Sequence, residues 1–151
     1  MLHKIDHINI VVTDMARSIR FYTELLGFQL TKQAYVEGDW VETVVGLPDV
    51  QADVAYLVLP DGPRLELMQY NAPVGTARKE NSLPNTVGLR HVAFQVTDID
   101  AIVKRLRMEK IDVLSSPASV PASTVSHQEG AKWFCYLRDP DGVILELAEY
   151  R

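Results

Sequence analysis

The segments DHINIVVTDM at residues 6–15 and RHVAFQVTDI at residues 90–99 are two versions of one sequence. Their alignment places His7 on His91 and Asp14 on Asp98, at an offset of 84 residues. A second pair of segments, DGPRLELMQY at 61–70 and DGVILELAEY at 141–150, follows in the same order at an offset of 80. Two matched blocks in one order indicate a duplicated module, and the difference in offset fits a surface loop of altered length.

This duplication predicts one domain, residues 1–151, that contains two modules. The modules cover residues 1–72 and 86–151, and a polar linker at 73–85 joins them. A chain of 151 residues is about the size of a single domain. We therefore expect the two modules to share one architecture.

Each module has the pattern of a strand, a helix and about three further strands, which predicts an α+β fold of two tandem βαβββ modules. His7–Val12 and His91–Val96 are rich in β-branched residues, and each ends just before an aspartate that can cap a helix. The remaining apolar stretches predict strands at Phe28–Val36, Trp40–Val45, Val54–Leu59, Arg64–Tyr70, Trp133–Leu137 and Val143–Tyr150. The segment 115–130, rich in Ser, Pro and Ala, predicts a loop or a poor strand.

Composition excludes several classes of partner. The formal net charge of −5 argues against binding to a phosphate backbone, so we expect no nucleic-acid partner. No apolar run approaches the roughly 20 residues that a membrane span needs. Cys135 is the single cysteine and cannot form an intrachain disulfide, which favours a reducing, cytoplasmic location.

Two histidines and two glutamates are the candidate functional residues. Alternation along a strand places His7 on the face opposite Ile8 and Ile10, and it places Glu66 opposite its leucine neighbours. Glu146 has the same setting in the second module, and a buried carboxylate needs a cationic partner or a metal. If the two modules face each other around a pseudo-twofold axis, these residues predict a divalent metal site. The alternative is that all four are ordinary solvated strand residues.

Three motifs carry a resemblance to a known superfamily. DHINIVV with FYTELLGF in the first module, RHVAFQVTDID in the second and the closing DPDGVILELAEY resemble the vicinal oxygen chelate superfamily. This group includes glyoxalase I, methylmalonyl-CoA epimerase, fosfomycin-resistance thiol transferases, extradiol dioxygenases and bleomycin-binding proteins. The resemblance covers nearly the whole chain and implies paired βαβββ modules that form a cupped mixed sheet around a metal.

The resemblance also implies a ligand set and a reaction. The superfamily's ligand positions fall on His7, Glu66, His91 and Glu146, around one divalent ion of nickel, cobalt, zinc, manganese or iron. This set resembles bacterial-type glyoxalase I, whereas the epimerase usually has Gln at the position of Glu66. The implied function is a glyoxalase-like lyase or isomerase that transfers a proton next to a carbonyl through a metal-stabilised enediolate. Glu146, Glu66 and Glu42 are the candidate bases.

Substrate-binding residues and alternative functions complete these expectations. Arg64, Asn9 and Gln95 share strand faces with the predicted ligands and are candidates for contact with a small carbonyl or thioester substrate. Arg64 has an equally plausible role as the partner of a nearby carboxylate. One alternative function is an acyl-CoA epimerase, and another is a non-catalytic protein that binds an antibiotic. We expect a homodimer.

Overall fold

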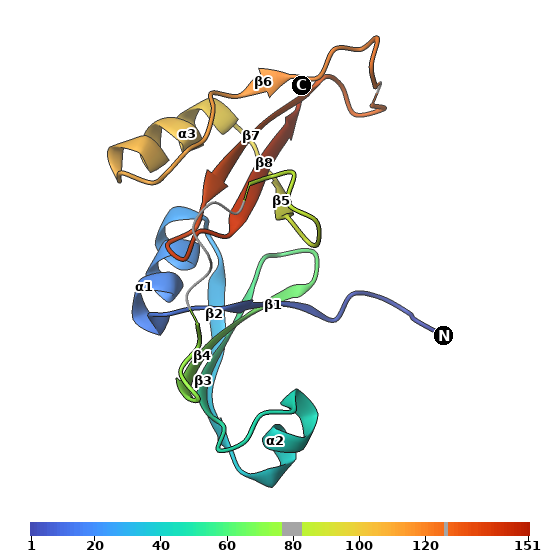
Figure 1. Ribbon diagram of the computed structural model, residues 1–151. Helices are drawn as coiled ribbons and strands as arrows, with labels where there is room; N and C mark the ends of the chain where they lie inside the picture. The colour runs from blue at the N-terminus through green and yellow to red at the C-terminus, as the bar shows by residue number, and fades with distance from the viewer. Residues whose placement is uncertain (77–82, 126) are drawn as a thin grey trace. The chain divides into compact units, whose positions relative to one another are not determined.

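The computed structural model describes residues 1–76, 83–125 and 127–151, and the chain forms two compact units, Met1–Ala77 and Arg78–Arg151 (Figure 1). The first unit contains β1 (His7–Val11), α1 (Met15–Arg20), the π-helical turn η1 (Phe21–Leu25), β2 (Gln29–Glu37), α2 (Asp39–Val45), β3 (Gln51–Val58) and β4 (Arg64–Ala72). The second unit contains β5 (His91–Gln95), α3 (Ile99–Met108), β6 (Ala118–Ser119), β7 (Lys132–Arg138) and β8 (Ile144–Tyr150). The predicted α+β fold of two modules is confirmed.

The two units have the same sheet topology. The strand orders are β1-β4-β3-β2 and β5-β8-β7-β6, so in each unit the last strand lies beside the first. That pairing is parallel in both units, and the other pairings are antiparallel. Its register places Asn9 opposite Glu66 and Ala93 opposite Glu146. Segments more than 50 residues apart in the sequence therefore meet at one edge of each sheet, because β1 and β5 are edge strands.

One face of the first sheet packs against its helix. Leu65 and Leu67 of β4 and Ile10 of β1 are almost fully buried, and α1 contacts β3 and β4. Burial of one leucine side chain stabilises the fold by about 2 kcal/mol. Glu66 alternates with these leucines and therefore lies on the opposite face, as the strand pattern predicts. In the second unit, Leu147 of β8 is buried in the same way and α3 contacts β8.

The helix starts are the predicted ones. The carboxylate of Asp14 accepts a hydrogen bond from the backbone N–H of Arg17, and that of Asp98 accepts one from the N–H of Ala101. These side chains satisfy N–H groups that have no partner within the helix. Apolar residues at positions 15, 19, 22 and 26, followed by Gly27, predict one helix as far as Leu26, and the structure divides this segment between α1 and η1.

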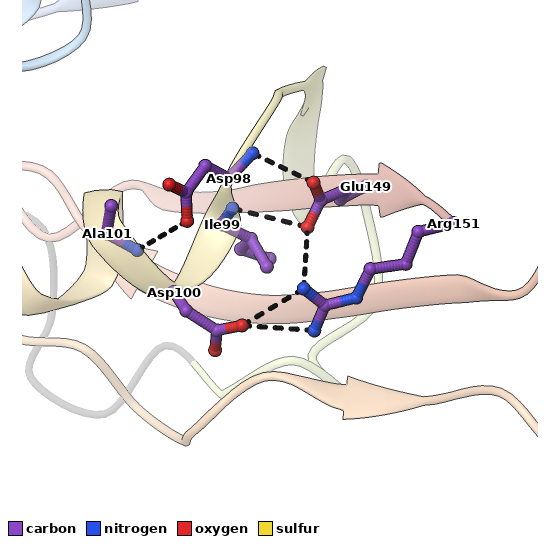
Figure 2. A network of polar contacts seen from close by, with 6 residues as sticks. All are labelled: Asp98, Ile99, Asp100, Ala101, Glu149 and Arg151. Carbon is purple, nitrogen blue, oxygen red and sulfur yellow. Dashed lines mark hydrogen bonds and ion pairs between the residues drawn. The ribbon is translucent and has the colours of Figure 1, made fainter.

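A second residue in each unit also caps the helix, and it comes from the last strand. In the first unit, Gln69 accepts a hydrogen bond of 2.7 Å from the N–H of Met15. In the second unit, Glu149 accepts bonds from the N–H groups of Asp98 and Ile99, at 2.8 and 3.3 Å (Figure 2). Figure 2 also shows Arg151, which contacts both Glu149 and Asp100 and links the chain end to α3.

The predicted strand at Trp40–Val45 is wrong, because this segment forms helix α2. Its β-branched valines favour a strand, yet glycines at both ends set the local conformation. Gly38 and Gly46 have φ values of 93° and 71°, which other residues rarely adopt, and Gly46 ends the helix in a left-handed conformation. Acidic side chains in the first turn favour the helix further through its dipole.

Among residues 1–76, 83–125 and 127–151, no helix combines the length and the apolar character that a membrane crossing requires.

We expect Glu149→Ala to lower the free energy of unfolding by about 1–3 kcal/mol, because two backbone N–H groups at the start of α3 lose their acceptor. Glu149→Gln should cost less, since an amide oxygen makes the equivalent bond at Gln69 in the first unit. Urea unfolding followed by circular dichroism measures both changes. Glu129→Ala, at an exposed loop carboxylate, is the control and should change stability by less than about 0.5 kcal/mol. An equal loss in all three variants would contradict the capping role.

Candidate functional site

The first unit brings together one histidine and one glutamate from neighbouring strands. His7 begins β1, and Glu66 lies in the middle of β4 on the same face of the sheet. The Nε2 atom of His7 is 3.5 Å from Oε2 of Glu66. The parallel register explains this contact. His7 lies opposite Arg64, and Glu66 is two residues further along β4 on the same face of the sheet.

Asp6 fixes the orientation of the His7 ring. Its Oδ2 atom lies 2.9 Å from Nδ1 of His7 and also accepts a hydrogen bond from the guanidinium of Arg64. The hydrogen bonds from these two residues lower the pKa of Asp6 below its usual value, so Asp6 is ionised at neutral pH. An ionised carboxylate can only accept, and Nδ1 therefore carries the proton. In the neutral ring, Nε2, the nitrogen that faces Glu66, then has the lone pair that can bind a ligand.

Neutral groups hold the Glu66 carboxylate. Asn9 Nδ2 donates a hydrogen bond of 2.7 Å to Oε2, from the position directly opposite Glu66 on β1. Tyr56 lies opposite Glu66 on the other side, in β3, and its hydroxyl is hydrogen-bonded to the carboxylate. This bond, together with partial burial, raises the pKa of Tyr56.

The second unit contains the equivalent pair. Nε2 of His91, at the start of β5, is 3.4 Å from Oε2 of Glu146 in β8. Glu146 is 4% exposed and takes a cation as its partner, because Nζ of Lys132 lies 2.7 Å from Oε1. Tyr136 lies opposite Glu146 in β7, and its pKa is raised, mainly by burial and further by the glutamate charge.

The two pairs match, whereas their supporting residues differ. The offset of 84 places Arg90 at the position of Asp6 and Ala93 at the position of Asn9. The offset of 80 places Ala52 at the position of Lys132. The tyrosines alone are common to both sets. Besides the tyrosine, the glutamate is therefore supported by a neutral amide in one unit and by an ammonium group in the other.

The donor atoms of each pair fit a shared divalent ion. Two ligand atoms about 2.1 Å from one metal are about 3.0 Å apart at a right angle and about 3.4 Å apart at the tetrahedral angle. The observed separations are 3.5 and 3.4 Å. Imidazole nitrogen and carboxylate oxygen suit nickel, cobalt, zinc, manganese and iron. No group of three or more His, Cys, Asp or Glu side chains that could hold a metal occurs among residues 1–76, 83–125 and 127–151. Each pair by itself offers two donors.

The other predicted site residues have different settings. Arg64 is engaged by Asp6, and its guanidinium also lies over the Tyr56 ring, 5.4 Å from the centroid. Gln95 is exposed in β5, opposite Ala148 and on the same face as Glu146. Glu42 lies in helix α2 and not in the predicted strand, and its role as a base stays a prediction from the resemblance.

Four residues around the pairs were not predicted from the sequence: Asp6, Tyr56, Lys132 and Tyr136. A signal existed for the tyrosines, because Tyr56-Leu57 matches Tyr136-Leu137 at the same offset of 80 as the glutamates. Asp6 and Lys132 have no counterpart in the other module, so the repeat could not identify them.

Comparisons with known proteins agree on one superfamily. The sequence model of the Glyoxalase/Bleomycin resistance protein/Dioxygenase superfamily matches residues 4–147. The chain is 34% identical to the protein YaeR of Escherichia coli (strain K12), with 98% of this chain and 97% of YaeR aligned. It is 30% identical to a 2-epi-5-epi-valiolone epimerase from Actinomyces sp, with 95% of this chain and 77% of the epimerase aligned. A solved glyoxalase family protein from Bacillus cereus superposes with a TM-score of 0.83 at 31% identity, covering 99% of this chain and 95% of that one.

Relatives with lower sequence identity are named after two different reactions. Mitochondrial methylmalonyl-CoA epimerase from Mus musculus is 26% identical over 98% of this chain and 74% of the epimerase. A probable lactoylglutathione lyase from Vibrio cholerae is 27% identical over 97% of this chain and 91% of the lyase. Both an isomerase and a lyase thus share the sequence pattern of this chain.

We expect Cys135 to be unreactive in the folded protein. It is 1% exposed, and burial raises its pKa from 9.0 to about 11. The Cys135 thiol of the folded protein therefore stays protonated at pH 8 and does not react. In the unfolded chain the same thiol ionises above its ordinary pKa, so the folded state loses stability as the pH rises from about 9 to 11. Alkylation with iodoacetamide at pH 8, with and without denaturant, measures this. Equal rates in both conditions would contradict the burial argument.

Proposed function

The chain belongs to the Glyoxalase/Bleomycin resistance protein/Dioxygenase superfamily, and from that membership we propose that it is a metal-dependent enzyme that transfers a proton at the carbon next to a carbonyl group. One observation carries the proposal. A histidine nitrogen and a glutamate oxygen lie 3.5 Å apart in one unit and 3.4 Å apart in the other, at matching positions of two duplicated sheets.

His7, Glu66, His91 and Glu146 would hold the cation together, which requires the two pairs to meet. When bound, a divalent cation supplies a Lewis acid that stabilises the negative charge developing on the substrate oxygen. The tautomer that Asp6 imposes on His7 supports this role, because it leaves Nε2 as the available ring nitrogen. We propose that Arg64 acts through Asp6 and does not contact the substrate.

The two glutamates are the groups that can accept the proton from the substrate carbon. Each has one oxygen next to a histidine and a fixed donor on the carboxylate, which is Asn9 for Glu66 and Lys132 for Glu146. Donors that fix the carboxylate reduce the reorganisation needed for proton transfer. We propose Glu146 and Glu66 as bases before Glu42, because Glu42 belongs to a helix that connects two strands.

We propose a glyoxalase-type lyase or isomerase as the reaction class, acting on a small carbonyl compound, in a cytoplasmic homodimer. Epimerisation of an acyl-CoA thioester is a second candidate, favoured by the relatives that are named epimerases. Both reactions begin with the same proton abstraction and differ in where the proton returns. A protein that only binds a small molecule would need neither the metal nor the exchange.

We expect His7→Ala and His91→Ala each to weaken binding of Co²⁺ by tenfold or more, because each removes one of the proposed nitrogen ligands. Competition with a chelating dye measures the affinity. His3→Ala, at an exposed histidine before β1, is the matched control and should bind as the wild-type protein does. If His3→Ala weakens binding as much as the other two variants, the proposed ligand set is wrong.

We expect the metal-loaded protein to exchange the proton next to the carbonyl of a correct substrate with solvent deuterium. NMR in deuterated water tests the hemithioacetal of glutathione and methylglyoxal against methylmalonyl-CoA. Glu146→Gln should reduce exchange at least a hundredfold if Glu146 is the base, since an amide cannot accept the proton. Glu66→Gln is the matched variant in the other unit. Tight binding of a compound without exchange would favour the binding-protein alternative.

A further inference from the structure

We propose that Lys132 is a specificity-determining residue that selects substrates carrying a negatively charged oxygen near the reacting carbonyl. The proposal rests on the proposed metal-dependent function. Lys132 lies in β7 on the same face as Glu146 and belongs to neither repeated motif. Its ammonium group is the one cation bonded to the glutamate in either described His–Glu pair.

The contacts of Lys132 leave part of its ammonium group available. Nζ is 2.7 Å from Oε1 of Glu146 and lies over the ring of Phe134, 5.1 Å from the centroid. The side chain retains 21% of its accessible surface. An ammonium group has three N–H donors, and the bond to Glu146 uses one of them. A ligand oxygen beside Glu146 can therefore meet a donor with a positive charge.

The fold does not require a cation at this place. In the first unit, Glu66 is held by the neutral donors Asn9 and Tyr56, and the position of Lys132 is taken by Ala52, which is fully buried. A neutral donor from β5 would serve Glu146 in the same way, but position 93 is an alanine. Lys132 is thus more than an obligatory partner for a buried carboxylate, because a neutral solution exists in the same chain.

The balance of charges at the proposed site leaves the positive charge of Lys132 available to an anionic ligand. The two glutamates carry two negative charges and a divalent cation carries two positive charges, so these groups together are neutral. Arg64 adds no net charge because Asp6 neutralises it. Lys132 adds one positive charge close to Glu146, where Coulomb attraction favours an anionic oxygen over a neutral one. The favoured substrates are therefore anions, such as compounds with a carboxylate next to the carbonyl.

Oxalate binding tests the proposal, because oxalate is a small dianion with adjacent oxygens. The probe is titrated calorimetrically into the full chain at saturating Co²⁺, after the Co²⁺ affinity of each variant has been measured separately. We expect Lys132→Met to weaken oxalate binding at least tenfold, the loss typical of a charge-assisted hydrogen bond. Lys132→Arg keeps the charge and should bind oxalate within about threefold of the wild-type protein.

A double variant separates recognition of the anion from support of the carboxylate. Ala93→Asn combined with Lys132→Met gives Glu146 the same neutral donor that Asn9 gives Glu66. We expect this variant to fold and to hold Co²⁺ but to bind oxalate as weakly as Lys132→Met. Wild-type oxalate affinity in the double variant, or in Lys132→Met, would overturn the proposal. If the wild-type protein holds no Co²⁺, the proposed function fails first, and the role of Lys132 fails with it.

Discussion

The parallel pairing of the first and last strands of each unit is the constraint on which the candidate site depends. In the first unit it brings His7 beside Glu66, although 58 residues separate them in the sequence. The same pairing places His91 beside Glu146 in the second unit. The alternation of side chains buries the flanking leucines under the helix and leaves the carboxylate on the other face. A shift of the register by one residue would exchange these faces and remove both pairs.

The features predicted from the sequence are those that the duplication repeats. The strands that begin at His7 and His91 and the aspartate helix caps occur twice, so each occurrence supports the other. The face occupied by Glu66 followed from its buried neighbours, because strand alternation has only two outcomes. The assembly of the four donors around one metal stays a prediction, since each pair lies within its own unit.

The predictions that are wrong or missing concern features that the duplication does not repeat. Helix α2 has no counterpart among the described residues of the second unit, and its valines favour a strand, whereas the positive φ angles of Gly38 and Gly46 end the neighbouring segments and frame a helix. Asp6 and Lys132 were missed for a related reason, because their roles depend on contacts with Arg64 and Glu146 from other strands. Propensity describes a segment on its own, whereas these roles arise from neighbours that the sheet supplies.

Divergence around a retained pair shows which parts of the site tolerate change. Each half keeps the histidine, the glutamate and the tyrosine opposite the glutamate. The donors to the carboxylate changed in kind, from the amide of Asn9 to the ammonium group of Lys132. A buried carboxylate requires some donor, but its geometry is met by a neutral or a charged one. The choice of donor therefore changes the charge beside the glutamate while the strand pairing stays the same, and under the proposed function this would alter ligand preference within one architecture.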